Sequence, residues 1–151
     1  MALTKEVVKL SESEAVVKVY GNDATPLTIT LDSLVSSTQS LSGTRNVTIS
    51  GVQWTGAPGA CYFIKRNGVI VMTLLADNGN FIDMAGTYFP PDTSYSSSDI
   101  VVTIAKADGT TAVQGELWLR LRKSTGYASK IETALFGIYE DTTTVGSCLL
   151  Y

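Results

Sequence analysis

Short runs of β-forming residues recur along this chain with turn residues between them, and no helical periodicity of any length precedes residue 124. Regular spacing of this kind is typical of an antiparallel sandwich or barrel. The stretch PLTITLD (26–32) alternates most clearly, with apolar Leu27, Ile29 and Leu31 separated by polar residues. We therefore predict an all-β, single-domain antiparallel β-sandwich, jelly-roll or Ig-like, over residues 1–123.

Residues 124–151 form a C-terminal extension in this prediction, packed on the domain or on a neighbouring chain. SKIETALFGIYED (129–141) fits a short amphipathic helix, yet it also tolerates strand alternation, so a helix and an extended arm both stay open. The chain ends on the apolar Leu149, Leu150 and Tyr151. Chain ends usually fray, and an apolar end indicates docking.

Two dipeptides that favour two-residue type I′ turns predict hairpins. A turn at Asp108–Gly109 would pair residues whose numbers sum to 217, which matches apolar with apolar along residues 100–117. A turn at Asn67–Gly68 would give a sum of 135 and leave both faces of the hairpin apolar. Such a hairpin is expected to be covered on both sides. The following run FIDM suggests a three-stranded meander over residues 60–84, and residues 33–44 and 86–99 are expected to be loops.

Charge and hydropathy exclude several classes of partner. The net charge is −3 and the pI is about 4.8, whereas a nucleic-acid-binding domain would show a basic patch. The sequence contains no run of 18 apolar residues, so it predicts no transmembrane helix, and the N-terminus lacks the apolar core of a signal peptide. We expect no nucleic-acid or membrane partner, and synthesis in a cytoplasm.

The sequence offers little for catalysis. It contains no histidine, which excludes a Ser-His-Asp or Cys-His nucleophile, and it has no P-loop or GxGxxG motif. Cys61 and Cys148 cannot make a four-ligand zinc site by themselves, and they are expected to be buried thiols more readily than a disulfide. We predict no enzyme activity, no catalytic, metal or cofactor site and no cofactor, with a two-carboxylate hydrolase as a remote alternative.

The stretch GELWLRLRKS (115–124) is the best candidate for a binding surface. If Leu117, Leu119 and Leu121 face the core, then Trp118, Arg120 and Arg122 point outward. Tryptophan beside arginine is enriched in interface hot spots. The alternative is that a loop covers Trp118 and the arginine stems pack over it. Trp54 is expected in the core, with a sugar-stacking platform as its alternative.

The stretches SGVQWTGAPGACYFIKRNGVIVMTLL and YFPPDTSYSSSDIVVTI, and the tail VGSCLLY, give the chain a layout that resembles the small virion structural proteins of tailed bacteriophages, cyanophages in particular. The resemblance covers about residues 15–123 and carries over no functional residue. It implies a non-catalytic protein of the virion, assembled in the host cytoplasm. Its partners would be other virion proteins, namely major capsid, neck or tail subunits, and further copies of itself.

The resulting hypothesis is a capsid decoration or cement protein, or a head–tail junction protein. Its expected interface residues are Trp118, Arg120, Arg122, Leu149, Leu150 and Tyr151. The alternative is a carbohydrate-binding or host-adhesion module of a phage particle, with an aromatic platform of Trp54, Tyr88 and Tyr95.

Overall fold

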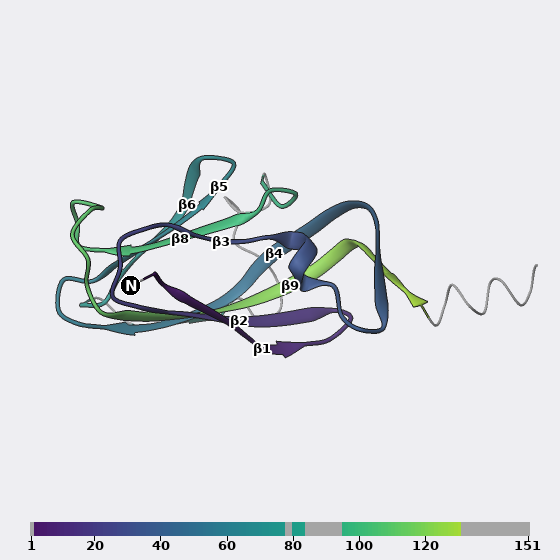
Figure 1. Ribbon diagram of the computed structural model, residues 1–151, viewed down its shortest axis with the longest axis horizontal. Coiled ribbons are helices and arrows are strands. Elements are labelled where there is room, and N and C mark those ends of the chain that lie inside the picture. Colours follow the sequence, from purple (N-terminus) through teal and green to yellow (C-terminus); the bar gives the residue numbers. More distant parts are fainter. Residues whose placement is uncertain (1, 78–79, 84–94, 131–151) are drawn as a thin grey trace, which may run out of the picture.

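Two antiparallel sheets build the protein, as predicted for an all-β domain (Figure 1). The computed structural model describes residues 2–77, 80–83 and 95–130. One sheet has five strands in the order β1-β2-β9-β4-β7, and the other has four in the order β3-β8-β5-β6. The elements are β1 (Thr4–Leu10), β2 (Glu14–Gly21), β3 (Leu27–Ile29), the 3₁₀ helix η1 (Leu31–Leu34), β4 (Gln39–Gly56), β5 (Cys61–Arg66), β6 (Val69–Leu75), β7 (Phe81–Asp83), β8 (Ile100–Ala105) and β9 (Gly115–Ser129).

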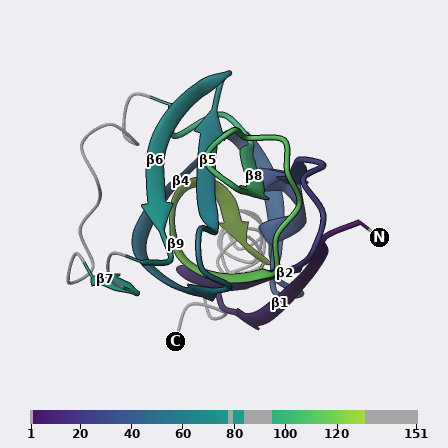
Figure 2. The same ribbon diagram turned by 90° about the vertical axis from the view of Figure 1, so that its left-hand side faces the viewer.

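The core lies between the two sheets, which Figure 2 shows nearly end-on. Alternate residues of β2 and of the first half of β9 point into it, as the sequence alternation predicts, whereas all seven residues of β1 are exposed. From the five-stranded sheet come Val17 and the three leucines of β9, and Ile29, Tyr62 and Ile64 come from the four-stranded sheet; all of them are fully buried. Trp54 is also a core residue, as expected, and its indole N–H donates to the carbonyl of Leu75 at 2.9 Å.

The predicted hairpin around Asp108–Gly109 is wrong as a pair of neighbouring strands. Only its tip follows the sum of 217, through the Ala105–Ala112 bridge and the hydrogen bond from Lys106 N to Thr111 O. Beyond the tip, β8 joins the four-stranded sheet and β9 the five-stranded sheet. Their apolar residues do share one core, but they face each other across it. Alternation reports the face a residue occupies and leaves its neighbour open.

The turn at this tip also differs from the predicted type I′ turn. That turn requires positive φ at both central residues. Gly109 has φ of 75°, whereas Asn67 is the only non-glycine residue with positive φ in the described ranges, so Asp108 does not meet the requirement. The N–H of Gly109 donates to the carbonyl of Lys106 at 2.8 Å, which places Asp108 inside a four-residue turn.

The hairpin at Asn67–Gly68 is confirmed, with one change of register. Asn67 and Gly68 have φ of 52° and 74°, as a type I′ turn needs. The first two pairs next to the turn follow the sum of 135, and then a bulge shifts the register, so that Ile64 pairs with Met72. The meander is wrong, because β7 crosses over and pairs with β4 of the other sheet.

Two segments differ from their predicted ends. β4 begins at Gln39, so residues 39–44 are strand although their Ser/Thr content suggested a loop. β9 continues past residue 123 to Ser129, where it pairs with Gln39. The predicted helix or arm and the apolar chain end lie outside the described residues.

A tyrosine and two glycines lock the sheets together at one end. Gly56 and Gly115 are paired between β4 and β9. The hydroxyl of Tyr62 reaches across from β5 and donates to the carbonyl of Thr55. A Cβ on Gly115 would lie 2.8 Å from both this hydroxyl and the Cγ2 atom of Ile104. The glycine pair therefore makes the room that this close approach needs.

Candidate functional site

The outward row of β9 lies in the middle of the five-stranded sheet. Leu117, Leu119 and Leu121 are fully buried, and Trp118 and Arg120 between them are half-buried on the outer face. The predicted direction of the row is therefore correct. Neighbouring strands supply its surroundings, because β2 pairs with β9 on one side and β4 on the other.

Trp118 is packed among polar and charged groups. The ammonium group of Lys18 lies 5.4 Å from the centroid of the Trp118 ring and 4.6 Å from that of Tyr20. The same ammonium pairs with Glu116 at 3.3 Å, and the Trp118 indole N–H donates to Glu116 at 3.1 Å. Cation–π contact and ion pairing thus hold the ring in one place. A side chain fixed before binding loses less entropy when a partner docks.

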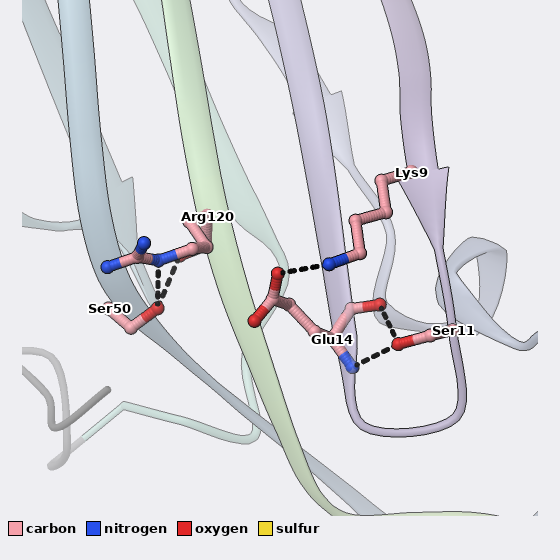
Figure 3. A network of polar contacts seen from close by, with 5 residues as sticks. All are labelled: Lys9, Ser11, Glu14, Ser50 and Arg120. Carbon is pink, nitrogen blue, oxygen red and sulfur yellow. Dashed lines mark hydrogen bonds and ion pairs between the residues drawn. The ribbon is translucent and has the colours of Figure 1, made fainter. Parts of the chain in front are cut away.

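Arg120 is held by β4 and β7. Its Nε–H donates to the hydroxyl of Ser50 at 3.3 Å, and that hydroxyl donates to the carbonyl of Arg120 at 3.2 Å (Figure 3). Its guanidinium also pairs with Asp83 of β7. A bulge in β4 between Ile49 and Gly51 occurs at Ser50. A Cβ on Gly51 would lie 3.2 Å from the guanidinium, so glycine allows the arginine to lie close to the strand.

A groove of about 160 Å³ opens beside these two side chains. Trp118 lines it together with Phe81, whose side chain is 61% exposed. The remaining lining residues are Val16, Gly51, Val52, Gln53 and Arg120. Small-molecule pockets usually measure about 300–1,000 Å³, so the groove suits one inserted side chain or one sugar ring. We call Trp118, Arg120, Phe81 and Gln53 the aromatic groove.

Not every predicted interface residue belongs to this groove. Trp118 and Arg120 line it, whereas Arg122 is exposed and pairs in register with Glu14 of β2, further along the row. Glu14 itself pairs with Lys9 at 3.1 Å and does not line the groove (Figure 3). Leu149, Leu150 and Tyr151 lie outside the described residues.

Sequence reasoning missed Phe81. Alternation predicts the run FIDM as the third strand of a meander, which would place it beside β6. It pairs instead with residues 51–53 of β4, which brings Phe81 next to Gln53 on the face that carries Trp118. The run itself was the available signal, but its partner strand could not be derived from alternation.

The aromatic platform proposed for the carbohydrate alternative is not formed as predicted. Trp54 is buried in the core and cannot present a ring face to a sugar. Tyr95 is partly buried against the core, and Tyr88 lies outside the described residues. The aromatic residues that line the groove are Trp118 and Phe81.

Two buried cations, which the sequence did not predict, hold the scaffold rather than the groove. Arg66 is fully buried, and its guanidinium donates to the carbonyls of Val47, Ser96 and Ser98 at 2.6–3.1 Å. Lys123 donates to Leu34 O and to Gln39 Oε1, both at 2.7 Å, and burial lowers the pKa of its amine. Both satisfy carbonyl groups that would otherwise be costly to bury.

Cys61 is a free, buried thiol, and Cys148 lies outside the described residues. Burial, with a smaller contribution from the charge of Asp77, raises the pKa of the Cys61 thiol. The thiol therefore stays protonated near neutral pH, and a protonated thiol is a poor nucleophile.

Within residues 2–77, 80–83 and 95–130, no three side chains of His, Cys, Asp or Glu come together in a way that could hold a metal ion. No helix in the same ranges is long and apolar enough to span a membrane.

Comparisons of the chain with protein-family models, curated proteins and solved structures give no significant match.

Proposed function

We propose that this chain is a non-catalytic structural protein of a bacteriophage virion, which binds other virion subunits at the capsid surface or at the head–tail junction. The observation that carries the proposal is the aromatic groove, where a positioned tryptophan and arginine border an opening beside an exposed phenylalanine. Tryptophan and arginine dominate the binding energy of many interfaces.

The chemistry of the groove supports binding of a protein side chain. Its lining is mainly apolar, and the guanidinium of Arg120 at its border is paired with Asp83. An apolar side chain of a partner subunit would fill the opening without leaving a charge buried and unpaired. Repeated copies on a symmetric shell would strengthen such a small contact by multivalency.

The test is binding to particles of the phage that encodes the chain, prepared without it. Purified protein is mixed with these particles, and the bound amount is measured by co-sedimentation. We expect saturable binding at a copy number that fits the particle's symmetry, and an affinity about 30-fold lower for Trp118→Ala, as for a hot spot of about 2 kcal/mol. Val7→Ala on β1 removes another exposed apolar side chain of the same sheet and should bind like the wild type.

Two results would contradict the proposal. One is a protein that stays in the supernatant at every concentration. The other is equal loss of binding in the Trp118→Ala and Val7→Ala variants, which would show that the aromatic groove is not the contact.

Carbohydrate binding is the second candidate, because the aromatic Trp118 and Phe81 line the groove together with the amide-bearing Gln53. Sugars commonly combine stacking with a few polar contacts. A glycan array probed with the wild type and with Trp118→Ala separates the two candidates. Specific glycan binding that disappears in the variant would favour adhesion, whereas particle binding without any glycan signal would favour the structural role.

A further inference from the structure

β6 forms an edge of the four-stranded sheet, and it differs from every other edge in the described structure. It pairs with β5 and with no other described strand (Figure 2). Its seven residues, VIVMTLL, include no charge and no proline. Three of its apolar side chains are exposed, with Val69 at 41%, Ile70 at 49% and Leu75 at 38%.

The other three edges carry the usual protection against pairing with another chain. β3 has three residues and directly follows Pro26, and β7 has three residues with Asp83 at its end. β1 is as long as β6, but it carries Lys5, Glu6 and Lys9. Short length, proline, charge and β-bulges are devices that keep exposed edges from associating. β6 has seven residues without charge or proline, and the bulge at Val71 is the one such device it carries, so Met72–Leu75 remains a regular, uncharged edge.

The backbone groups along this edge can be located from two hydrogen bonds. Ala76 N donates to Ala60 O across the β5–β6 ladder at 2.9 Å. Because hydrogen-bonded and non-hydrogen-bonded pairs alternate in antiparallel strands, the N–H and C=O groups of Thr73 and Leu75 point away from β5. The bond from the Trp54 indole to the Leu75 carbonyl agrees with this direction. The N–H and C=O of Thr73 therefore lie at the open edge.

We propose that β6 pairs antiparallel with β6 of a second copy of this chain across a two-fold axis, which joins two four-stranded sheets into one. A strand without charge can lie against its own copy with no like charges opposed. Antiparallel pairing of Met72–Leu75 with its copy sets Leu75 of one chain toward the Met72 end of the other, so that apolar residues meet across the two-fold axis. β1 paired with itself in the same way would bring lysines together.

The bulge in β6 limits where hydrogen bonds form. The register shifts between the pairs Lys65–Ile70 and Ile64–Met72, which leaves Val71 as the extra residue. Met72–Leu75 is the regular part of the strand, so Thr73 lies in the part that pairs. The inference concerns self-association alone and does not depend on which partner the aromatic groove binds.

The experiment is analytical ultracentrifugation of the full chain over a range of concentrations, with three variants. Thr73→Pro removes an edge N–H and leaves the ladder with β5 intact, a position where proline is tolerated. Ile70→Lys places a charge at the edge, where two copies would repel. Val8→Lys is the matched control, because Val8 is 40% exposed and lies on the other long edge strand, β1. Circular dichroism confirms that each variant retains its strand content.

We expect the wild type and Val8→Lys to sediment at twice the chain mass of 16.1 kDa. Thr73→Pro and Ile70→Lys should sediment at the chain mass at the same concentration. A wild type that is monomeric throughout would overturn the proposal. So would a dimer that Val8→Lys dissociates while both β6 variants leave it intact. Particle binding is measured separately, so a monomer that still binds particles would refute the dimer and leave the proposed function standing.

Discussion

The outer row of β9 and the open edge of β6 are two surfaces of one domain with opposite designs. β9 is the central strand of its sheet, and its outward Trp118 and Arg120 are fixed by Lys18, Glu116, Ser50 and Asp83. β6 is an edge strand without charge, and its apolar Val69, Ile70 and Leu75 are exposed.

The difference fits the two proposed modes of association. The backbone N–H and C=O groups of a central strand are already bonded to the two neighbouring strands, so only its side chains remain for recognition. Side chains that are held in position lose less entropy when a partner binds. An edge strand still has backbone groups to offer, and main-chain bonding tolerates many side chains. We expect the aromatic groove to select a partner and the β6 edge to join copies.

Trp118 is proposed to serve recognition and not stability, and Trp54 is its matched control in the core. Trp54→Ala should lower the free energy of unfolding by about 3–5 kcal/mol, because it leaves a large cavity and an unpaired Leu75 carbonyl. Trp118→Ala should lower it by about 1 kcal/mol, as for a partly exposed side chain. Urea unfolding measures both values. Equal losses in the two variants would mean that Trp118 is part of the core.

The sheets must hold together before either surface can act, and Gly115 tests that point. Gly115→Ala should cost about 3 kcal/mol, because the added methyl meets Tyr62 and Ile104 in a packed core. Adding Tyr62→Phe should recover part of the loss, since it removes the contact with the hydroxyl and leaves those with the Tyr62 ring and Ile104. Thermal unfolding of the single and double variants checks this. A neutral Gly115→Ala would contradict the close approach of the sheets.

Arg120 and Asp83 should matter for the shape of the groove more than for stability. Their ion pair is about one-third exposed on each side, so water and salt screen it. We expect Arg120→Met and Asp83→Asn each to change the free energy of unfolding by less than about 1 kcal/mol, while both weaken particle binding. A large loss of stability that persists in high salt would mean that the pair belongs to the scaffold.

The turn that carries the chain from one sheet to the other should give the smallest effect. Asp108 accepts hydrogen bonds from the N–H groups of Thr110 and Thr111, both at 2.9 Å, and from the Thr111 hydroxyl. These bonds lower the pKa of its carboxyl from 3.8 to about 2, the Thr111 hydroxyl contributing most. A folded pKa below the unfolded one gives stability that is present above the unfolded pKa and lost as the pH falls through the folded pKa.

We therefore expect the wild type to lose an advantage over Asp108→Asn between about pH 4 and about pH 2. Thermal midpoints of the two proteins across that range provide the measurement. The asparagine keeps an acceptor for both N–H groups but cannot titrate. Parallel pH curves for the two proteins would contradict this assignment.

Sequence alternation predicted faces correctly and strand partners poorly. Leu117, Leu119 and Leu121 were placed toward the core, and Trp118 away from it, because the strand period is two. The same pattern could not tell a neighbour in one sheet from a residue facing it across the core, which is why β8 and β9 were wrongly paired. The bulge at Val71 could not be predicted because an extra residue leaves no mark where the neighbouring residues, 69–72, are all apolar.

The parts of the candidate site that come from distant segments could not be predicted. Phe81 reaches the groove through the crossover from β6 to β7, and Asp83 meets Arg120 only because of it. Arg66 and Lys123 lie in alternating runs, and the alternation does not show whether a cation there faces the core or the solvent. Their carbonyl partners come from segments up to 89 residues away in the chain.

The central claim is that a neighbouring molecule covers the β6 edge, and hydrogen exchange at the Thr73 amide tests it most directly. The wild type is labelled in deuterated buffer at several protein concentrations, and exchange at this amide is followed by NMR or fragment-resolved mass spectrometry. We predict protection that increases with concentration, because only an association can protect an amide in this way. Protection that is equally strong at every concentration would mean that the chain covers its own edge, and would contradict the account.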